Sequence, residues 1–224
     1  PEFNAASIRT SEHINRWAES NNNITVITCF PNFPKGKLFK GYKNKLYQVE
    51  KFNNIKIIRV WTFIAPNSGF ILRSIDYISF AISSTIASFF IKKHNLVIAT
   101  SPQFFSIIAG YFISIFKRTK LVIEIRDLWP DSLLTVGVLR KNLIFKILKK
   151  IEYFIYRKSH KIIVVTNSTA NILQKNGIKE NKISLIYNGV NLDKFRPSTK
   201  NQDLLIKYNL QNYFCVGYIG TIGL

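Results

Sequence analysis

The stretch ISLIYNGVNLDKFRP, residues 183–197, says most about how this chain folds. Its first residues are β-branched and aromatic, which favours a strand. Asn188 and Gly189 follow as a turn pair, because both residue types tolerate a positive φ. Phe195 and the rigid Pro197 then follow at fixed distances. The Asn-Gly pair alone would indicate only a strand that leaves a sheet through an ordinary turn. The fixed spacing from this pair to Phe195 and Pro197 is a much more specific pattern.

Upstream of this stretch, short runs rich in Val, Ile and aromatic residues alternate with helical patterns. Several of the runs are apolar on both faces, which suits a parallel sheet covered on both sides. The alternation predicts a doubly wound α/β domain with a mostly parallel sheet and right-handed crossovers. Strands are predicted at 24–30, 55–61, 96–100, 120–125, 161–166, 183–187 and 214–219, and helices at 5–20, 70–92, 103–116, 143–158 and 168–176.

The ends of the sequence suggest a fragment of a longer protein. The chain has no methionine, opens at Pro1 without a strand and stops at Leu224 just after one. We expect a first domain over residues 1–192, a polar linker over 193–212 and the start of a second domain over 213–224.

The composition favours anionic partners. The 32 basic and 12 acidic residues give a net charge of +20, which attracts nucleic acid, acidic lipid or a phosphorylated substrate. We expect no nucleic acid partner, because the basic residues are dispersed and form no recognised motif. The longest apolar stretch, 75–91, contains Asp76 and is shorter than the roughly 20 residues that a spanning helix needs.

The cysteines and histidines predict no metal site. Cys29 and Cys215 have no zinc or redox spacing, and reduced thiols in a cytosolic compartment are the default. His13, His94 and His160 are scattered, with no carboxylate or cysteine at ligand spacing, and a solvated or helix-end position is expected for each.

Polar residues follow several of the predicted strands, and ligands of open α/β sheets bind at the carboxyl ends of the strands. Glu124 and Arg126 lie on one side of a strand, and Asp127 stands at its exit. Asp127 could orient or deprotonate an acceptor hydroxyl. The structural alternative is that Arg126 and Asp127 cap a helix and pair with neighbours. Since each such segment directly follows a strand, we expect all of them to converge on one rim.

Three further segments offer groups for an anionic ligand or a sugar. Lys35, beside Gly36, could hold a diphosphate as a point charge, and Arg9 near a helix start could meet an anion. Trp129 is expected to shape its loop, although a tryptophan face also packs against sugar rings. Each cation could equally be an ordinary surface residue among the 32 basic ones.

Residues 188–197 resemble the N-G-V-D-x-x-x-F-x-P signature that closes the first domain of family-4 glycosyltransferases, with Asn191 where that family usually has Asp. The resemblance covers nearly the whole chain. It is closest to the subgroup that adds amino or deoxy sugars to lipid-linked precursors of surface polysaccharides. The other matching pieces are residues 1–9, 29–36, 100–103 and 124–131.

This resemblance implies the Rossmann-like, acceptor-side N-terminal domain of a two-domain B-type glycosyltransferase, with the first strand and the second domain outside the sequence. It implies a retaining hexosyl transfer without a metal or other cofactor, from a uridine-linked nucleotide sugar to a glycan on polyprenyl diphosphate. Gln103 and Asn188 would contact the substrates, and Gly220 and Gly223 would approach the donor's phosphates. Many relatives have His-Asp where this chain has Arg126-Asp127, so a histidine is not available at that position. The fragment itself is expected to be inactive.

Residues 143–160 predict a basic amphipathic helix. The helix could lie on an anionic membrane surface, or its apolar stripe could pack against the core with a solvated basic back. Both readings hold together if the stripe packs inward and the lysines and arginines alone meet lipid. This would place the protein in the cytoplasm, at the inner face of the membrane. Three alternatives remain at this point: another two-domain α/β sugar-nucleotide enzyme such as an epimerase, a basic nucleic-acid-binding module, and a non-catalytic membrane scaffold. The stripe comprises Ile144, Ile147, Leu148, Ile151, Phe154 and Ile155.

Overall fold

The computed structural model describes residues 5–65, 69–135, 137, 141–193 and 195–218. The chain forms two compact units, residues 1–187 and residues 188–224. The predicted domain boundaries at 192/193 and 212/213 stay predictions. In the first unit the helices are α1 (Ala5–Glu19), α2 (Phe70–Ser88), α3 (Phe104–Phe116), α4 (Asp131–Thr135), α5 (Leu143–Lys158), α6 (Asn167–Lys175) and the short η1 (Glu180–Lys182).

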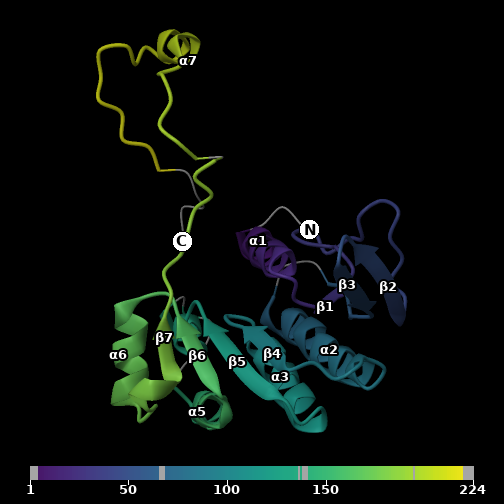
Figure 1. Ribbon diagram of the computed structural model, residues 1–224. Helices are drawn as coiled ribbons and strands as arrows, with labels where there is room; N and C mark the ends of the chain where they lie inside the picture. The colour runs from purple at the N-terminus through teal and green to yellow at the C-terminus, as the bar shows by residue number, and fades with distance from the viewer. Residues whose placement is uncertain (1–4, 66–68, 136, 138–140, 194, 219–224) are drawn as a thin grey trace. The chain divides into compact units, whose positions relative to one another are not determined.

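The strands confirm the α/β architecture (Figure 1). Among the described residues they pair in two sheets: one of three strands in the order β1-β3-β2, and one of four strands in the order β4-β5-β6-β7. All neighbours are parallel except β2 and β3. The strands are β1 (Ile24–Cys29), β2 (Tyr47–Phe52), β3 (Ile55–Val60), β4 (Leu96–Thr100), β5 (Lys120–Ile125), β6 (Lys161–Val164) and β7 (Ile183–Leu185).

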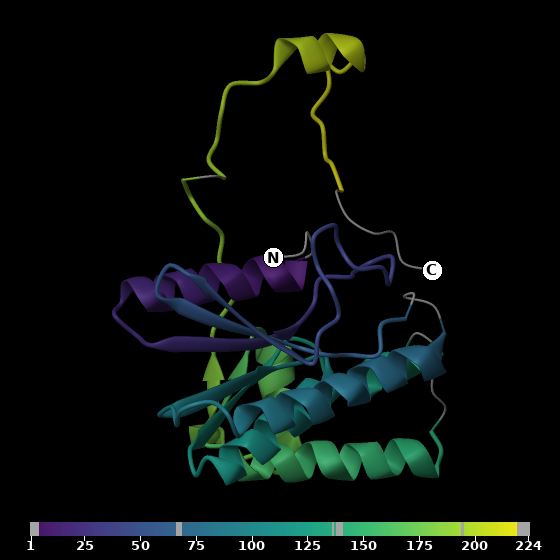
Figure 2. The ribbon, with the colours of Figure 1, turned by 90° about the vertical axis from the view of Figure 1, so that its right-hand side faces the viewer.

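Helices lie on both sides of the strands. In Figures 1 and 2, α1 lies above the strands, where it packs against β1 and β3, whereas α2, α3 and α5 lie together below them. The main core forms where α3, α5 and α6 pack on the four-stranded sheet, and its β-branched strand residues are fully buried, as expected for parallel strands covered by helices. They include Ile123, Ile125, Ile162 and Val164.

Besides the short helices α4 and η1, which were not predicted, two strands differ from the expected elements. β2 was missed, because its sequence YQVEKF alternates with charged residues and it forms the antiparallel edge of its sheet. The strand predicted at 214–219 is wrong over its described residues, since 214–218 form no strand and Phe214 is 95% exposed. A strand needs a neighbour to satisfy its backbone groups, and none pairs with 214–218 within the described structure.

The structure shows which side of α5 is buried, a point that the sequence left open. The buried face is formed by Glu152, Tyr153, Ile155 and Tyr156. Within the apolar stripe, Ile155 alone is buried, and Leu148 is half-buried. The remaining four stripe residues are exposed: Ile144, Ile147, Ile151 and Phe154. The stripe therefore faces outward, because a polar cluster around Glu152 occupies the inner side.

Gly110 lets α3 approach β4 closely. A Cβ atom at Gly110 would lie 2.7 Å from the Cβ of Ala99. We expect Gly110→Ala to lower the free energy of unfolding by about 1–2 kcal/mol, because overpacking costs about 1–3 kcal/mol and better helix propensity returns up to about 1. Urea unfolding measures this change. Gly189→Ala is the control, since its Cβ would meet nothing within 4 Å, and equal effects of the two changes would contradict the prediction.

The second unit contains one helix, α7 (Gln202–Lys207), within its described residues. The side chain of Asn201 caps α7 by accepting a hydrogen bond from the Leu204 amide at 3.1 Å. At the start of the unit, the Asn191 side chain accepts a hydrogen bond from the Asp193 amide at 3.0 Å. Asparagine makes this turn as aspartate does, so the departure from the signature at position 191 leaves the local turn possible.

No described helix is both long and apolar enough to span a membrane.

Candidate active site

An ion pair joins the amino-terminal helix to the carboxyl end of β5. The Arg9 guanidinium on α1 contacts Glu124 Oε1 through Nη2 at 2.5 Å and through Nε at 3.1 Å. Both side chains are 14% exposed. Thr100, the last residue of β4, donates its hydroxyl to Glu124 Oε2 at 3.0 Å. Arg9, Thr100 and Glu124 therefore form one cluster. For these three segments, this is the meeting at one edge of the sheet that the sequence predicted.

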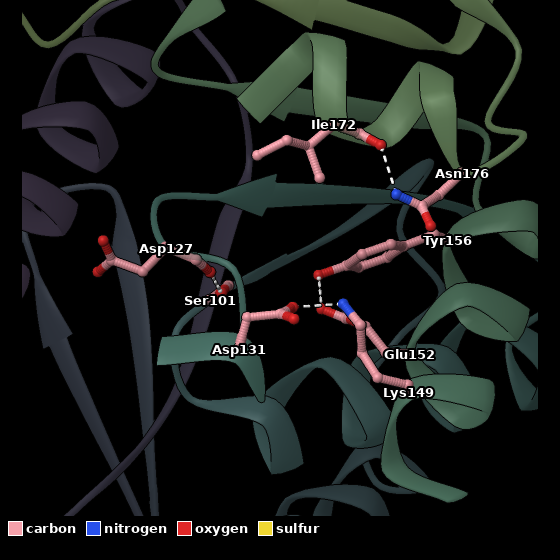
Figure 3. A network of polar contacts seen from close by, with 8 residues as sticks. All are labelled: Ser101, Asp127, Asp131, Lys149, Glu152, Tyr156, Ile172 and Asn176. Atoms are coloured by element: carbon pink, nitrogen blue, oxygen red, sulfur yellow. Dashed lines mark hydrogen bonds and ion pairs between the residues drawn. The ribbon is translucent and has the colours of Figure 1, made fainter. Parts of the chain in front are cut away.

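Asp127 lies at the exit of β5, next to this cluster. The Ser101 amide donates to the Glu124 carbonyl at 2.8 Å, and the Ser101 hydroxyl donates to the Asp127 carbonyl at 2.6 Å. The loops after β4 and β5 are thus held together through main-chain groups. The Asp127 side chain is exposed and points away from Ser101 in Figure 3, whereas Arg126 is half-buried. This arrangement leaves the Asp127 carboxylate accessible to a ligand.

Two predicted substrate contacts support the loops in the structure. The Gln103 side chain caps α3: its Oε1 accepts from the Ser106 amide at 3.1 Å and from the Ser106 hydroxyl at 2.7 Å. The Trp129 ring stacks on Phe104, with ring centroids 4.3 Å apart and an interplanar angle of 16°. One face of the indole is therefore occupied by the protein. This agrees with the loop-shaping role expected of Trp129.

The remaining predicted residues come from other segments, and two of them lie outside the described residues. Lys35 is exposed in the loop after β1, which belongs to the three-stranded sheet, and Gly36 has a φ of 61°. Asn188 is exposed and belongs to the second unit. Gly220 and Gly223 lie outside the described residues. The structure thus brings together Arg9, Glu124, Arg126 and Asp127 from the predicted set.

His13 departs from the solvated or helix-end position expected for it, because it lies within α1 and is half-buried. Burial is the first cause that lowers the pKa of its imidazole, and the charges of Arg9 and Arg126 lower it further, while the charge of Glu124 opposes them. These influences place His13 in the field of the Glu124 cluster. Its neutral form is favoured, so it can accept a proton. The signal was its position four residues after Arg9, which puts both on one face of α1.

A second polar cluster lies beneath the β5 loop (Figure 3). The Lys149 ammonium on α5 contacts the Asp131 carboxylate and lies 3.0 Å from Glu152 Oε2. The Tyr156 hydroxyl donates to Glu152 Oε1 at 2.9 Å. Glu152 is 1% exposed. Asp131, the first residue of α4, is the link through which this cluster fixes the segment that follows Asp127.

The protonation states in this second cluster follow from burial and pairing. Burial raises the pKa of Glu152 to about 7, although the Lys149 ammonium and the Tyr156 hydroxyl act to lower it. Burial acts to lower the pKa of Lys149, but its contacts with Asp131 and Glu152 outweigh burial and raise it. Lys149 therefore stays protonated at neutral pH, and Glu152 is poised between its two forms.

Within the described part of the chain, no three His, Cys, Asp or Glu side chains gather closely enough to hold a metal ion. Asp127 and His13 offer groups for proton transfer and hydrogen bonding at the end of β5.

Comparison with known families identifies the domain. The model of Glycosyltransferase Family 4 matches residues 6–194, a range that contains Arg9, Glu124, Asp127 and the turn at 188–189. No curated protein matches the chain. The matched range covers most of the sequence, and the parallel sheet flanked by helices agrees with a Rossmann-like N-terminal domain of the B-type fold. The chain belongs to glycosyltransferase family 4, whose amino-terminal domain it contains.

Proposed function

We propose that this protein transfers a hexose, with retention of anomeric configuration, from a uridine-linked nucleotide sugar to a glycan carried by polyprenyl diphosphate. The family supports sugar transfer in general. The observation that carries the proposal is the exposed Asp127 carboxylate at the exit of β5, beside the Arg9–Glu124 ion pair. The carboxyl ends of parallel strands are where α/β folds bind ligands.

In the proposed reaction an acceptor hydroxyl bonds to the anomeric carbon of the donor sugar as the bond from that carbon to the diphosphate breaks. The diphosphate leaves with the bonding electron pair, and Asp127 orients the hydroxyl and accepts its proton. Arg9 is held by Glu124, so we assign it to positioning the end of β5. Lys35, an exposed cation, is left to attract the donor's phosphates.

His13, whose neutral form is favoured, would relay or share the proton. Trp129 and Gln103 keep the neighbouring loops in place through Phe104 and Ser106. The proposed transfer requires no metal ion, because cations and amides of the protein would stabilise the departing diphosphate.

The test is a transfer assay with the protein expressed from its complete coding region. Uridine-linked hexoses are supplied with polyprenyl-diphosphate-linked acceptors, and the anomeric configuration of the product is determined by NMR. Formation of a glycoside with the donor's configuration supports the proposal. Inversion of configuration, or release or epimerisation of the sugar without an acceptor, would contradict it.

A further inference from the structure

The outer surfaces of α2, α3 and α5 are apolar and exposed. On α2 the exposed side chains recur every three or four residues and so form one stripe along the helix. Ile82 is 57% exposed and Phe90, just past the helix end, is 76% exposed. The exposed apolar residues are Ile71, Ile75, Ile78, Ile82, Ile86, Phe89 and Phe90 at α2, Phe112, Ile115 and Phe116 on α3, and Leu143, Ile144, Ile147, Ile151 and Phe154 on α5. We call this set the helical face.

The helical face is continuous across the three helices. Aromatic contacts join α2 to α3 through Phe89 and Phe116, whose ring centroids are 5.2 Å apart. They join α3 to α5 through Tyr111 and Phe154 at 5.8 Å, and Phe112 contacts both Phe116 and Tyr111 within α3. Figure 2 shows blue α2 and green α5 on the same side of the strands. Contiguous apolar surface of this kind marks an interaction site.

The charges around this face have one sign. The acids in the three helices are Asp76 and Glu152; Asp76 is half-buried, and Glu152 is 1% exposed and bonded to Lys149 and Tyr156. Most basic residues on and beside these helices, in contrast, are exposed. They are Arg73, Lys92, Lys93, Arg118, Lys141, Lys146, Lys150, Arg157 and Lys158.

A hollow of about 550 Å³ opens at the edge of the helical face. It lies where α3 and α5 end and β4 and β5 begin, opposite the Asp127 edge of the sheet. Its lining includes four cations, Lys93, Arg118, Lys120 and Lys158, and contains no acid. Ile115 of the helical face also lines it, so cationic groups and apolar surface meet at this point.

We propose that the helical face binds the surface of an anionic phospholipid bilayer, with a lipid phosphate in the hollow and the apolar side chains among the acyl chains. A bilayer fits better than a protein partner, because it offers negative charge and hydrocarbon together over a broad surface. This membrane contact extends the proposed function, and it depends on that function only in assuming a lipid-linked acceptor. Vesicle binding requires no catalysis.

Vesicle flotation of the protein expressed from its complete coding region tests this inference. Phosphatidylcholine vesicles with and without phosphatidylglycerol are the probes. We expect binding to the anionic vesicles alone, weakened by salt. Ile82→Ser with Phe90→Ser should weaken binding about tenfold or more. Arg118→Gln with Lys158→Gln should weaken it about twenty-five-fold, since each basic residue contributes roughly fivefold.

Matched controls lie away from the helical face. Phe52→Ser on β2 and Lys175→Gln on α6 change exposed residues and should leave vesicle binding unchanged. Circular dichroism checks that each variant is folded. Equal binding to both vesicle types, or equal loss in the controls, would overturn the inference. So would sedimentation showing that the helical face joins two copies of the chain.

The two proposals fail separately. Transfer to a detergent-solubilised acceptor by a protein that ignores vesicles would refute the membrane inference and leave the proposed function intact. Normal vesicle binding without sugar transfer would refute the proposed function alone.

Discussion

Replacing Asp127 with asparagine should reduce kcat for sugar transfer by about a hundredfold to ten-thousandfold, the range that a positioned general base contributes. Asparagine keeps the shape of the side chain and cannot take up the acceptor's proton. The main-chain carbonyl of residue 127 still accepts the Ser101 hydroxyl, so the loop should keep its conformation. Steady-state kinetics at saturating donor and acceptor measure the change.

A matched variant separates the role of Asp127 from the general effect of removing a surface carboxylate. Asp203→Asn is the control, since Asp203 is an exposed aspartate on α7. Transfer by Asp127→Asn at the original rate would remove this residue from the mechanism.

Replacing Lys149 with methionine should lower the free energy of unfolding by about 3–5 kcal/mol, as found when one partner of a buried ion pair is removed. Glu152 is 1% exposed and would lose its cationic partner. The Lys149 contact that anchors α4 through Asp131 would be lost as well. Urea and thermal unfolding measure the loss.

Lys150→Met is the matched control, because Lys150 is the next residue of the same helix and is exposed. Lys149→Met combined with Glu152→Gln should recover part of the stability, since no buried carboxylate then lacks a cation. A single Lys149→Met variant as stable as Lys150→Met would show that this cluster contributes nothing.

The buried carboxyl of Glu152 predicts how stability depends on pH. Its pKa is about 7 in the folded chain, above its ordinary value of 4.5. Between these values the folded state holds a proton that the unfolded state has released, so stability is greatest below pH 4.5 and falls as the pH rises towards 7. Asp76, whose pKa burial raises to about 6, acts in the same direction. Glu152→Gln should flatten this decline between pH 4.5 and 7, and an unchanged slope in urea unfolding would contradict the assignment.

The sequence predicted most elements of the fold because their signals are local. The apolar runs at β4 and β5 and the period of α3 correspond to elements at the expected residues. β2 escaped because its pattern mixes charged and apolar residues at an edge.

The sequence could not predict which side of α5 is buried, because periodicity gives a stripe and not its direction. Glu152 is buried, and Lys149 and Tyr156 satisfy its carboxylate. The partnership of Arg9 with Glu124 was equally inaccessible, since 115 positions separate them along the chain. The local motifs therefore indicated where polar groups gather, and the partners of those groups came only from tertiary structure.

The Arg9–Glu124 pair also acts as a tie between two parts of the scaffold. Helix α1 packs against β1 and β3 of the three-stranded sheet, while Glu124 belongs to the four-stranded sheet. The ion pair therefore couples the orientation of α1 to the position of the carboxyl end of β5. Substitutions on the opposite side of α1 would then change the rate of transfer without contacting any substrate, because they would shift α1 and with it the end of β5.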